Sequence, residues 1–371
     1  MPAQRKIRVL LIAPSMRILG GQAIQAQFLL EQFRKEPSIA AGFLPIDAKL
    51  FGPLAAVPFL RTLCRLLLYL ASLAATVPRY DIVHAFSASY WSYALWTLPA
   101  ILAGRLFRKK VIVHYHSGEA EDHLTRWRSA VPTLALAHEI VVASEYLVSV
   151  FANFGLRSRA IFNILDASPF HYRRRERLRP VFLTNRGLEP VYNVGCVLRA
   201  FEIVQRSCPD ASLAVAHDGS SRAQLESLAR ELKLRNTKFV GSVPRETMAR
   251  LYDEADIYLM SPDMDCTPGS VLECFASGLP VVATKAGGVP FVVRHEQTGL
   301  LVDCGDHEAL AASALWLLEN QDLAADLAGR ARLECAKYEA EPVRREWVRL
   351  YRELMGLPAA EEKRAAAAAS A

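Results

Sequence analysis

A strand–loop–helix–strand segment in the last third of the chain constrains the fold more than any other stretch. Ile257–Met260 is a short apolar run that predicts a buried strand, and residues 280–284 form a second such run. Between them, Thr267 is placed to cap a short helix, with Pro268 in its first position and Gly278 just past its end. These start and stop signals predict one unit of strand, loop, helix and strand.

Two acidic residues in this segment indicate a ligand. Asp265 lies in the loop and Glu273 in the helix, eight residues apart. The helix N-terminus at Pro268, Gly269 and Ser270 carries partial positive charge and free N–H groups, which suit a phosphate. Carboxylates accept hydrogen bonds from sugar hydroxyls, so a nucleotide or a sugar phosphate would use both features. The alternative is a capped helix with two incidental acids, and these residues alone favour neither.

Length and composition indicate an ordinary two-domain protein. The chain has 371 residues, of which 52% are hydrophobic and 22% charged, which favours packed cores over disorder. Its seven cysteines are scattered without a C-x-x-C pair, so we expect neither a zinc site nor a disulfide framework, and a reducing compartment. The basic start leads into an apolar run that is broken by Arg8 and ends at Pro14, which predicts a strand rather than a signal peptide.

Charge is distributed unevenly along the chain. Residues 1–170 hold 18 Lys and Arg against 10 Asp and Glu, a balance of +8, and the remainder holds 26 against 28, a balance of −2, which recovers the total of +6. A basic N-terminal half can attract an anionic membrane or an anionic acceptor. The alternative is a solvated basic surface.

The first strand–helix unit has the pattern of a doubly wound fold. Residues 7–14 predict a buried parallel strand, Gly20 and Gly21 follow, and a helical run covers about 22–33. Residues 81–84 and 111–116 predict two more strands, each ending in histidine.

Ligands of parallel sheets gather at the carboxyl ends of strands, which draws attention to these histidines. His114 and His116 share one face of their strand, and Glu119, Glu121 and Asp122 follow closely. A metal site is conceivable there, but no closed ligand set with recognised spacing is present, so we predict none. His84 is expected to neighbour the site or to be a buried, hydrogen-bonded histidine.

Residues 54–77 predict an apolar helix of ambiguous location. Phe59, Leu63, Leu66, Leu67, Leu70 and Leu73 recur at helical spacing. The longest uncharged run, 66–77, is 12 residues and falls short of the ~20 that span a bilayer. A core helix is favoured over an interfacial helix that lies on a membrane.

The segment around Asp265 and Glu273 resembles the acid-x7-Glu signature of retaining glycosyltransferases of family 4. Asp265 stands where the family usually has a first Glu, and Glu273 is the second acid. The matching positions continue through Leu272, Gly278, Pro280, Val281, Val282, Ala283, Gly287, Gly288 and Thr298–Val302.

The resemblance implies an α/β protein with the GT-B fold, two Rossmann-like domains facing across a cleft. Residues 1–170 would be the acceptor domain and 171–340 the nucleotide-sugar donor domain, with the basic run 171–180 as connector. A terminal helix, 341–357, would pack back on the first domain, and 358–371 would be a disordered tail.

The resemblance also assigns roles to individual residues. Arg186 and the helix N-terminus at 268–270 would stabilise the leaving diphosphate. Glu273 would hold the ribose, Asp265 the transferred sugar or its phosphate side, and His116 the sugar. The glycine pair at 20 and 21 would lie on the acceptor side.

This chain departs from the family pattern at its phosphate-binding residues. Val191 or Tyr192 occupies the place of a usual lysine, and Lys285 is the nearest candidate replacement. His217 likewise stands where a Gly-Asp-Gly motif begins. These departures keep two alternatives open, a degenerate protein that binds a nucleotide or glycan without turnover, and a sugar-nucleotide epimerase.

The implied partners are a nucleotide sugar, either a UDP- or a GDP-sugar, and a glycan or lipid-linked acceptor. No metal, other cofactor or nucleic acid is expected. We expect a cytoplasmic protein that can sit peripherally on the inner face of the membrane.

Overall fold

The computed structural model describes residues 5–18, 20–47 and 58–358, and gives the backbone alone for residues 58 and 59. The chain forms two compact units. Unit 1 comprises the residues up to Ile164 together with those from Ala340 onward, and unit 2 comprises Leu165–Glu339. We predicted boundaries after residues 170 and 340, and the structural division falls after 164 and 339. The predicted disordered tail lies, except for Pro358, outside the described residues.

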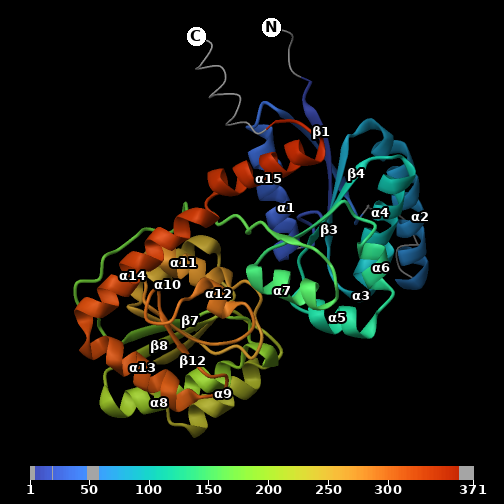
Figure 1. The fold of residues 1–371 in the computed structure, drawn as a ribbon. Helices are drawn as coiled ribbons and strands as arrows, with labels where there is room; N and C mark the ends of the chain where they lie inside the picture. The colour runs from blue at the N-terminus through green and yellow to red at the C-terminus, as the bar shows by residue number, and fades with distance from the viewer. Residues whose placement is uncertain (1–4, 19, 48–57, 359–371) are drawn as a thin grey trace, which may run out of the picture. The chain divides into compact units, whose positions relative to one another are not determined.

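Unit 1 is built on a parallel six-stranded sheet with the order β2-β1-β3-β4-β5-β6 (Figure 1). The strands are β1 (Ile7–Ala13), β2 (Ile39–Pro45), β3 (Ile82–Ser87), β4 (Lys110–Tyr115), β5 (Glu139–Val142) and β6 (Arg159–Ala160). Near-continuous apolar runs form these strands because both faces of a parallel sheet are covered. The strands expected at 7–14, 81–84 and 111–116 are therefore confirmed to within a few residues.

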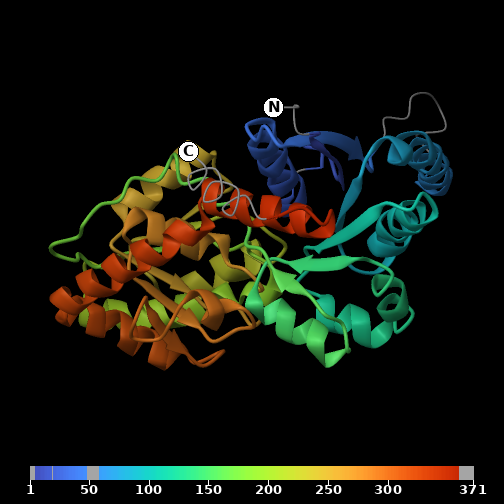
Figure 2. The same cartoon turned by 45° about the horizontal axis from the view of Figure 1, so that its top comes forward.

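Helices cover both faces of this sheet. They are α1 (Gly21–Arg34), α2 (Pro58–Thr76), α3 (Tyr90–Ser92), α4 (Leu98–Leu106), α5 (Ala120–Arg126), α6 (Ala130–Leu134), α7 (Glu145–Asn153) and α15 (Ala340–Leu354), with a 3₁₀ turn Val77–Arg79 and a π-helical turn Tyr93–Thr97. Figure 1 shows α15 beside α1 on one face, and Figure 2 shows the same pair from above. Trp347 and Tyr351 of α15 are fully buried there against Phe33 of α1. The C-terminal helix is thus part of the core of unit 1.

Helix α2 is only half a core helix. It packs against α4 and buries Tyr69 and Leu73, whereas Leu63, Leu67 and Leu70 are 41%, 57% and 41% exposed. By length and composition the segment Leu60–Arg79 passes as a membrane-spanning helix, with mean hydropathy 1.5 over an 18-residue window of which 17% is buried. A core helix of a soluble protein passes the same test but is mostly buried. The favoured prediction of a core helix therefore holds for one face only.

Unit 2 contains a second parallel six-stranded sheet, ordered β12-β11-β10-β7-β8-β9. Its strands are β7 (Val181–Thr184), β8 (Ser212–Ala216), β9 (Thr237–Gly241), β10 (Ile257–Met260), β11 (Val281–Thr284) and β12 (Leu300–Val302). Its helices are α8 (Val194–Ser207), α9 (Arg222–Glu231), α10 (Arg245–Glu254), α11 (Gly269–Ser277), α12 (Val289–Val292), α13 (His307–Glu319) and α14 (Gln321–Cys335), with 3₁₀ turns Pro190–Tyr192 and Ala336–Tyr338. The predicted strand–loop–helix–strand is β10–α11–β11, and it lies in the middle of this sheet.

The basic run 171–180 is more than a solvated connector. The guanidinium of Arg175 is buried and donates to the carbonyl oxygens of Tyr252, Ala255, Ser277 and Gly278 at 2.8–3.0 Å. Arg173 and Arg179 bind the buried Asp256 just before β10, at 2.6 and 2.7 Å. The segment is therefore tied to the amino ends of the central strands.

Candidate functional site

The carboxyl edge of the unit 2 sheet brings two predicted site residues together. Arg186 follows β7 by one residue of loop, and Asp265 lies between β10 and α11. Because β7 and β10 are neighbours in the sheet, their carboxyl ends meet, and Nη2 of Arg186 lies 2.5 Å from Oδ2 of Asp265. Both side chains are largely buried, at 16% and 6% exposure.

Burial and pairing act in opposite directions on these two charges. Burial alone would lower the pKa of Arg186, but Asp265 and three nearby tyrosines together outweigh it, and the net shift is upward. Burial raises the pKa of Asp265, and Arg186 offsets only part of that rise. Within the described part of the chain, Nε of Arg186 has no hydrogen-bond partner. The guanidinium therefore keeps a free, desolvated donor for a ligand anion.

Tyr192, rather than Val191, meets Arg186. The 3₁₀ turn Pro190–Tyr192 and a left-handed Asn193, with φ of 43°, turn the loop back toward the sheet edge. The Tyr192 ring then lies under the guanidinium carbon at 4.4 Å, while Val191 is 42% exposed. An aromatic ring thus stands against the site's arginine at the place where the resemblance expects a lysine.

A glycine pair holds the Asp265 loop in place. Gly287 has φ of 49°, and a Cβ there would lie 2.6 Å from the backbone oxygen of Asp265. A Cβ on Gly288 would lie 2.1 Å from the backbone oxygen of Cys266. Both positions therefore require glycine, and Gly288 N–H donates to the Asp265 oxygen at 2.6 Å.

The N-terminus of α11 is open. Pro268 is its N-cap, and no side chain among the described residues caps the helix. The expected capping by Thr267 is therefore wrong. The Thr267 hydroxyl is buried and has no hydrogen-bond partner among the described residues. A Cβ on Gly269 would meet no atom within 4 Å. Exposed helix N–H groups beside open space suit an anion. The predicted end of the helix is correct, because Gly278 is its left-handed C-cap with φ of 69°.

Glu273 lies inside α11, where its Oε2 accepts a hydrogen bond from the hydroxyl of Tyr252 at 2.7 Å. Burial raises the pKa of the Glu273 carboxyl, and the Tyr252 bond, Arg245 and Arg186 lower it in part. A carboxylate held in this way can accept hydrogen bonds from vicinal hydroxyls through its other oxygen.

The structure places Lys285 away from this cluster. Its side chain is 49% exposed and pairs with Asp303 at 3.1 Å. His217, in contrast, lies near Arg186, and burial together with this cation lowers the pKa of the imidazole. His217 has φ of 81°, a conformation that favours glycine, which explains why a glycine is usual at this position.

Three histidines of unit 1, His84, His114 and His116, form a buried cluster beside α15. His84 is fully buried, and its ring nitrogens lie 2.7 Å from the Tyr351 hydroxyl and 3.2 Å from Nδ1 of His114. It is therefore the hydrogen-bonded core histidine that one of the two expectations described. Burial lowers the pKa of both His84 and His116 to about 3, so both are neutral at physiological pH.

His116 and the glycine pair lie at the carboxyl edge of the unit 1 sheet. His116 directly follows β4, its ring stacks on Phe86 at 5.1 Å, and its Nε2 has no partner among the described residues. Gly20 and Gly21 begin α1 directly after the loop that follows β1, and a Cβ on either would meet nothing within 4 Å. The two glycines thus border open space, and His116 offers an unpaired ring nitrogen.

No group of three or more His, Cys, Asp or Glu within residues 5–18, 20–47 and 58–358 is placed to hold a metal ion. Asp122, one of the acids near His116, instead pairs with Arg126 at 2.8 Å and accepts from the Tyr90 hydroxyl.

Comparison with known proteins identifies the chain. Residues 173–334 match the family model described as "Glycosyl transferases group 1". Residues 173–334 therefore form a glycosyl transferases group 1 domain, which confirms the resemblance found in the sequence. The match contains Arg186, Asp265 and Glu273, so the unit 2 site lies within the family's own domain.

Relatives of this group 1 chain act on sugars. It is 30% identical over 254 residues to the GDP-mannose-dependent alpha-(1-6)-phosphatidylinositol monomannoside mannosyltransferase of Mycolicibacterium smegmatis, an alignment covering 62% of this chain and 66% of the relative. It is 27% identical over 219 residues to the sulfoquinovosyl transferase SQD2 of Arabidopsis thaliana, covering 56% and 41%. Among the first curated relatives, the chain spans between 32% and 53% of their length.

Solved structures show the fold of the group 1 chain. Anabaena HepE, in complex with UDP and glucose, superposes with a TM-score of 0.70 at 18% identity, covering 92% of this chain and 98% of HepE. The two parallel six-stranded sheets with flanking helices are those of the GT-B fold, which confirms the predicted fold class.

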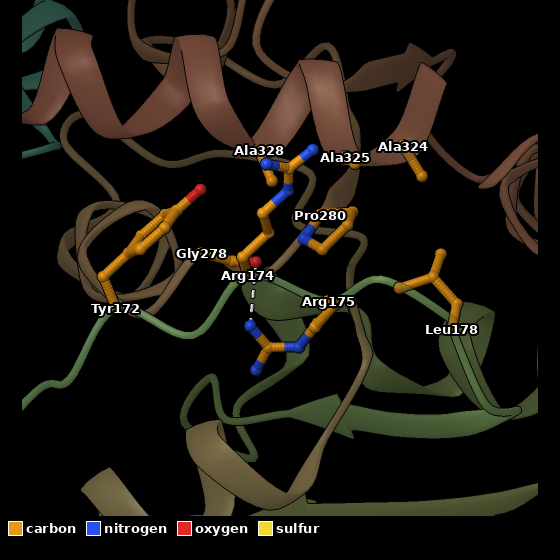
Figure 3. A pocket seen from close by; sticks show the side chains of 9 residues that line it. All are labelled: Tyr172, Arg174, Arg175, Leu178, Gly278, Pro280, Ala324, Ala325 and Ala328. Carbon is orange, nitrogen blue, oxygen red and sulfur yellow. Dashed lines mark hydrogen bonds between the residues drawn. The ribbon is translucent and has the colours of Figure 1, made fainter. Parts of the chain in front are cut away.

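A small pocket elsewhere in unit 2 contains none of the predicted site residues. Its lining residues Gly278 and Pro280 come just before β11, and Figure 3 shows Arg175 bonded to Gly278 there. Arg175 already donates to five different carbonyl oxygens, so its guanidinium there anchors the chain.

Sequence reasoning missed part of the group 1 site. Tyr252 and Asn185 were not singled out, and Tyr192 entered only as a substitute for lysine. A buried tyrosine carries no local signal, because its hydroxyl partners come from other elements of the fold.

Proposed function

We propose that this protein is a retaining glycosyltransferase that moves a sugar from a nucleotide-sugar donor to an acceptor hydroxyl in glycan, polysaccharide or glycolipid assembly. One observation carries the proposal: Arg186, Asp265 and the open N-terminus of α11 meet at one edge of the unit 2 sheet, with Glu273 on the same helix. A cation, helix N–H groups and carboxylates are the groups that a nucleotide diphosphate sugar needs.

The reaction breaks the bond between the sugar C1 and the diphosphate oxygen and forms a bond from C1 to the acceptor oxygen. The acceptor hydroxyl loses its proton, and the nucleoside diphosphate leaves with the added negative charge. Arg186 and the N–H groups of Gly269 and Ser270 stabilise that charge, which is where preorganised donors lower a barrier most. Glu273 binds the ribose hydroxyls, Asp265 orients the donor sugar or its phosphate side, and His116 offers Nε2 to the sugar.

Retention at C1 and independence of a metal ion are parts of the same proposal. Support for metal independence comes from Arg186, whose unpaired Nε can take over the charge-stabilising task that a divalent cation performs in other transferases. The nucleotide base stays open, because one relative is named for GDP-mannose and one structural neighbour binds UDP.

We also propose a cytoplasmic protein that contacts an anionic membrane through α2. Support comes from the exposed Leu63, Leu67 and Leu70, from Arg61 and Arg65 on the same helix, and from the absence of acidic residues in α2. An apolar face flanked by cations fits an interfacial helix. A lipid-linked acceptor, such as the one in the mycobacterial relative's name, would be reached from that surface.

A panel of UDP- and GDP-sugars separates the candidate functions. The transferase releases nucleoside diphosphate slowly without an acceptor and faster with a glycan or lipid acceptor. An epimerase would interconvert donor sugars without any acceptor, and a non-catalytic protein would bind a nucleotide without turnover. Conversion of the donor sugar to its epimer, or binding with no product, would replace the proposal.

A further inference from the structure

A chain of hydrogen-bonded side chains crosses unit 2 from β10 to α11. The hydroxyl of Tyr258 donates to Oδ1 of Asn185 at 2.8 Å, and Nδ2 of Asn185 donates to the oxygen of Tyr252 at 2.7 Å. The hydroxyl of Tyr252 in turn donates to Oε2 of Glu273 at 2.7 Å. Asn185 is 5% exposed and both tyrosines are fully buried. The four residues come from β10, the loop after β7, α10 and α11, so the tertiary fold assembles them.

The direction of each bond follows from the donors and acceptors available. An amide donates only through Nδ2 and accepts only through Oδ1, and a tyrosine hydroxyl has one proton. Because Asn185 donates to the Tyr252 oxygen, the Tyr252 proton is left for another acceptor. The Glu273 carboxylate at 2.7 Å is closer than the Ser270 carbonyl oxygen at 3.3 Å. Oε2 of Glu273 is thereby occupied, and Oε1 is left for a ligand.

The charged and titratable groups around Glu273 make this bond consequential. Arg245 on α10 and Arg186 after β7 favour the carboxylate, as does Tyr252 itself. Burial opposes them and raises the pKa of the carboxyl. Tyr258 and Cys274, the other titratable groups close by, are held neutral because burial raises their pKa values. The Tyr252 bond is therefore one of the few interactions that keep a buried carboxyl ionised.

We infer that Tyr252, oriented by Asn185 and Tyr258, is a positioning residue that aligns Glu273 so that Oε1 receives the ribose hydroxyls of a nucleotide. The inference rests on the proposed donor-binding role of Glu273. Asn185 directly precedes Arg186 in the chain, and it supplies the orienting amide by bonding both tyrosines.

Calorimetric titration of the full chain with UDP and with GDP, over a range of pH, tests the inference. In Tyr252→Phe the ring remains and the hydroxyl bond to Glu273 is lost. Nucleotide affinity should fall by roughly tenfold near neutral pH, as for a lost hydrogen bond to a charged group. It should recover as pH rises, because the carboxyl now needs a higher pH to ionise. A merely structural role would weaken binding equally at every pH.

Two further variants keep the test informative. Asn185→Leu removes the orienting amide and keeps a branched side chain of four heavy atoms. It should shift the pH profile in the same direction if Tyr252→Phe does not fold. Tyr338→Phe, at another buried tyrosine of unit 2, is the matched control and should leave the profile unchanged. Unshifted profiles in both Tyr252→Phe and Asn185→Leu would overturn the inference while wild-type binding still supported a nucleotide site. Absence of nucleotide binding to wild type would instead overturn the proposed function.

Discussion

The guanidinium carbon of Arg186 lies 4.4 Å from the centroid of the Tyr192 ring, while its Nη2 contacts Asp265 at 2.5 Å. The site's arginine is thus held between an aromatic face and a carboxylate. The N–H donors of a guanidinium that stacks on a ring point sideways, parallel to the ring face, and stay free to reach a ligand at the edge. Tyr192, at the place where the resemblance expects a lysine, therefore orients the Arg186 cation and does not supply a second positive charge.

Arg186 should carry most of the side-chain stabilisation of the leaving diphosphate. Arg186→Ala is expected to lower kcat/KM by about 10²–10³, the usual loss for one preorganised donor. Lys285→Ala is the matched control, because Lys285 is exposed and paired with Asp303, and it should stay near wild type. Full activity in Arg186→Ala on the best donor would contradict the placement of the diphosphate.

Tyr192 should act through Arg186. Tyr192→Phe keeps the stacked ring and is expected to retain kcat/KM, whereas Tyr192→Lys removes the ring and places a like charge beside the guanidinium. Even though Tyr192→Lys restores the family residue, we expect it to lower the activity. Steady-state kinetics of both variants on one donor would decide, and a gain in Tyr192→Lys would show that charge matters more than stacking.

Glu273→Gln should weaken nucleotide binding by ~1–3 kcal/mol, because an amide replaces a charged acceptor. Burial raises the pKa of the wild-type carboxyl, so wild-type affinity should fall as pH drops through that pKa, while the variant should be insensitive to pH there. Calorimetry with UDP and GDP measures both effects. Unchanged affinity in Glu273→Gln would refute the ribose-binding role.

Turnover should survive chelation. The proposed charge stabilisation comes from Arg186 and the α11 N-terminus, so EDTA is expected to leave the initial rate unchanged. Activity that EDTA abolishes and Mg²⁺ or Mn²⁺ restores would show a metal-dependent reaction and would return attention to His114 and His116.

The exposed face of α2 should bind anionic vesicles. Leu67→Glu is expected to reduce binding to phosphatidylglycerol vesicles by about fivefold or more, because it removes apolar contact area and adds repulsion. Leu333→Glu is the matched control, since Leu333 is 78% exposed on α14 in unit 2. Cosedimentation at low and high salt measures the binding. Equal loss in both variants, or no binding by wild type, would contradict the role of α2.

His217→Gly should stabilise the fold. Relief of the φ of 81° is expected to raise the free energy of unfolding by about 1 kcal/mol. Asn236→Gly, at φ of 55°, is the control and should gain less, because asparagine tolerates this region better. Chemical denaturation provides the comparison. A destabilised His217→Gly would indicate that the imidazole makes contacts that outweigh the backbone strain.

The sequence by itself determined the features that depend on neighbouring residues. The apolar runs at β1, β10 and β11, and the Gly278 stop of α11, were predictable because strand burial and helix termination follow from a few adjacent side chains. The spacing of Asp265 and Glu273 was likewise visible in the chain, and the resemblance it carried led to the family and to the GT-B fold.

Only the tertiary structure decided which side chains meet. Tyr252 and Glu273 are 21 residues apart on two different helices, and Tyr192 reaches Arg186 because of a turn that ends in a left-handed Asn193. The exposure of one apolar face of α2 could not be predicted from the sequence either. Periodicity shows that a helix has an apolar face, but it does not show which part of that face a neighbour covers. Such contacts depend on how elements distant in the sequence pack, and local propensity carries no information about that packing.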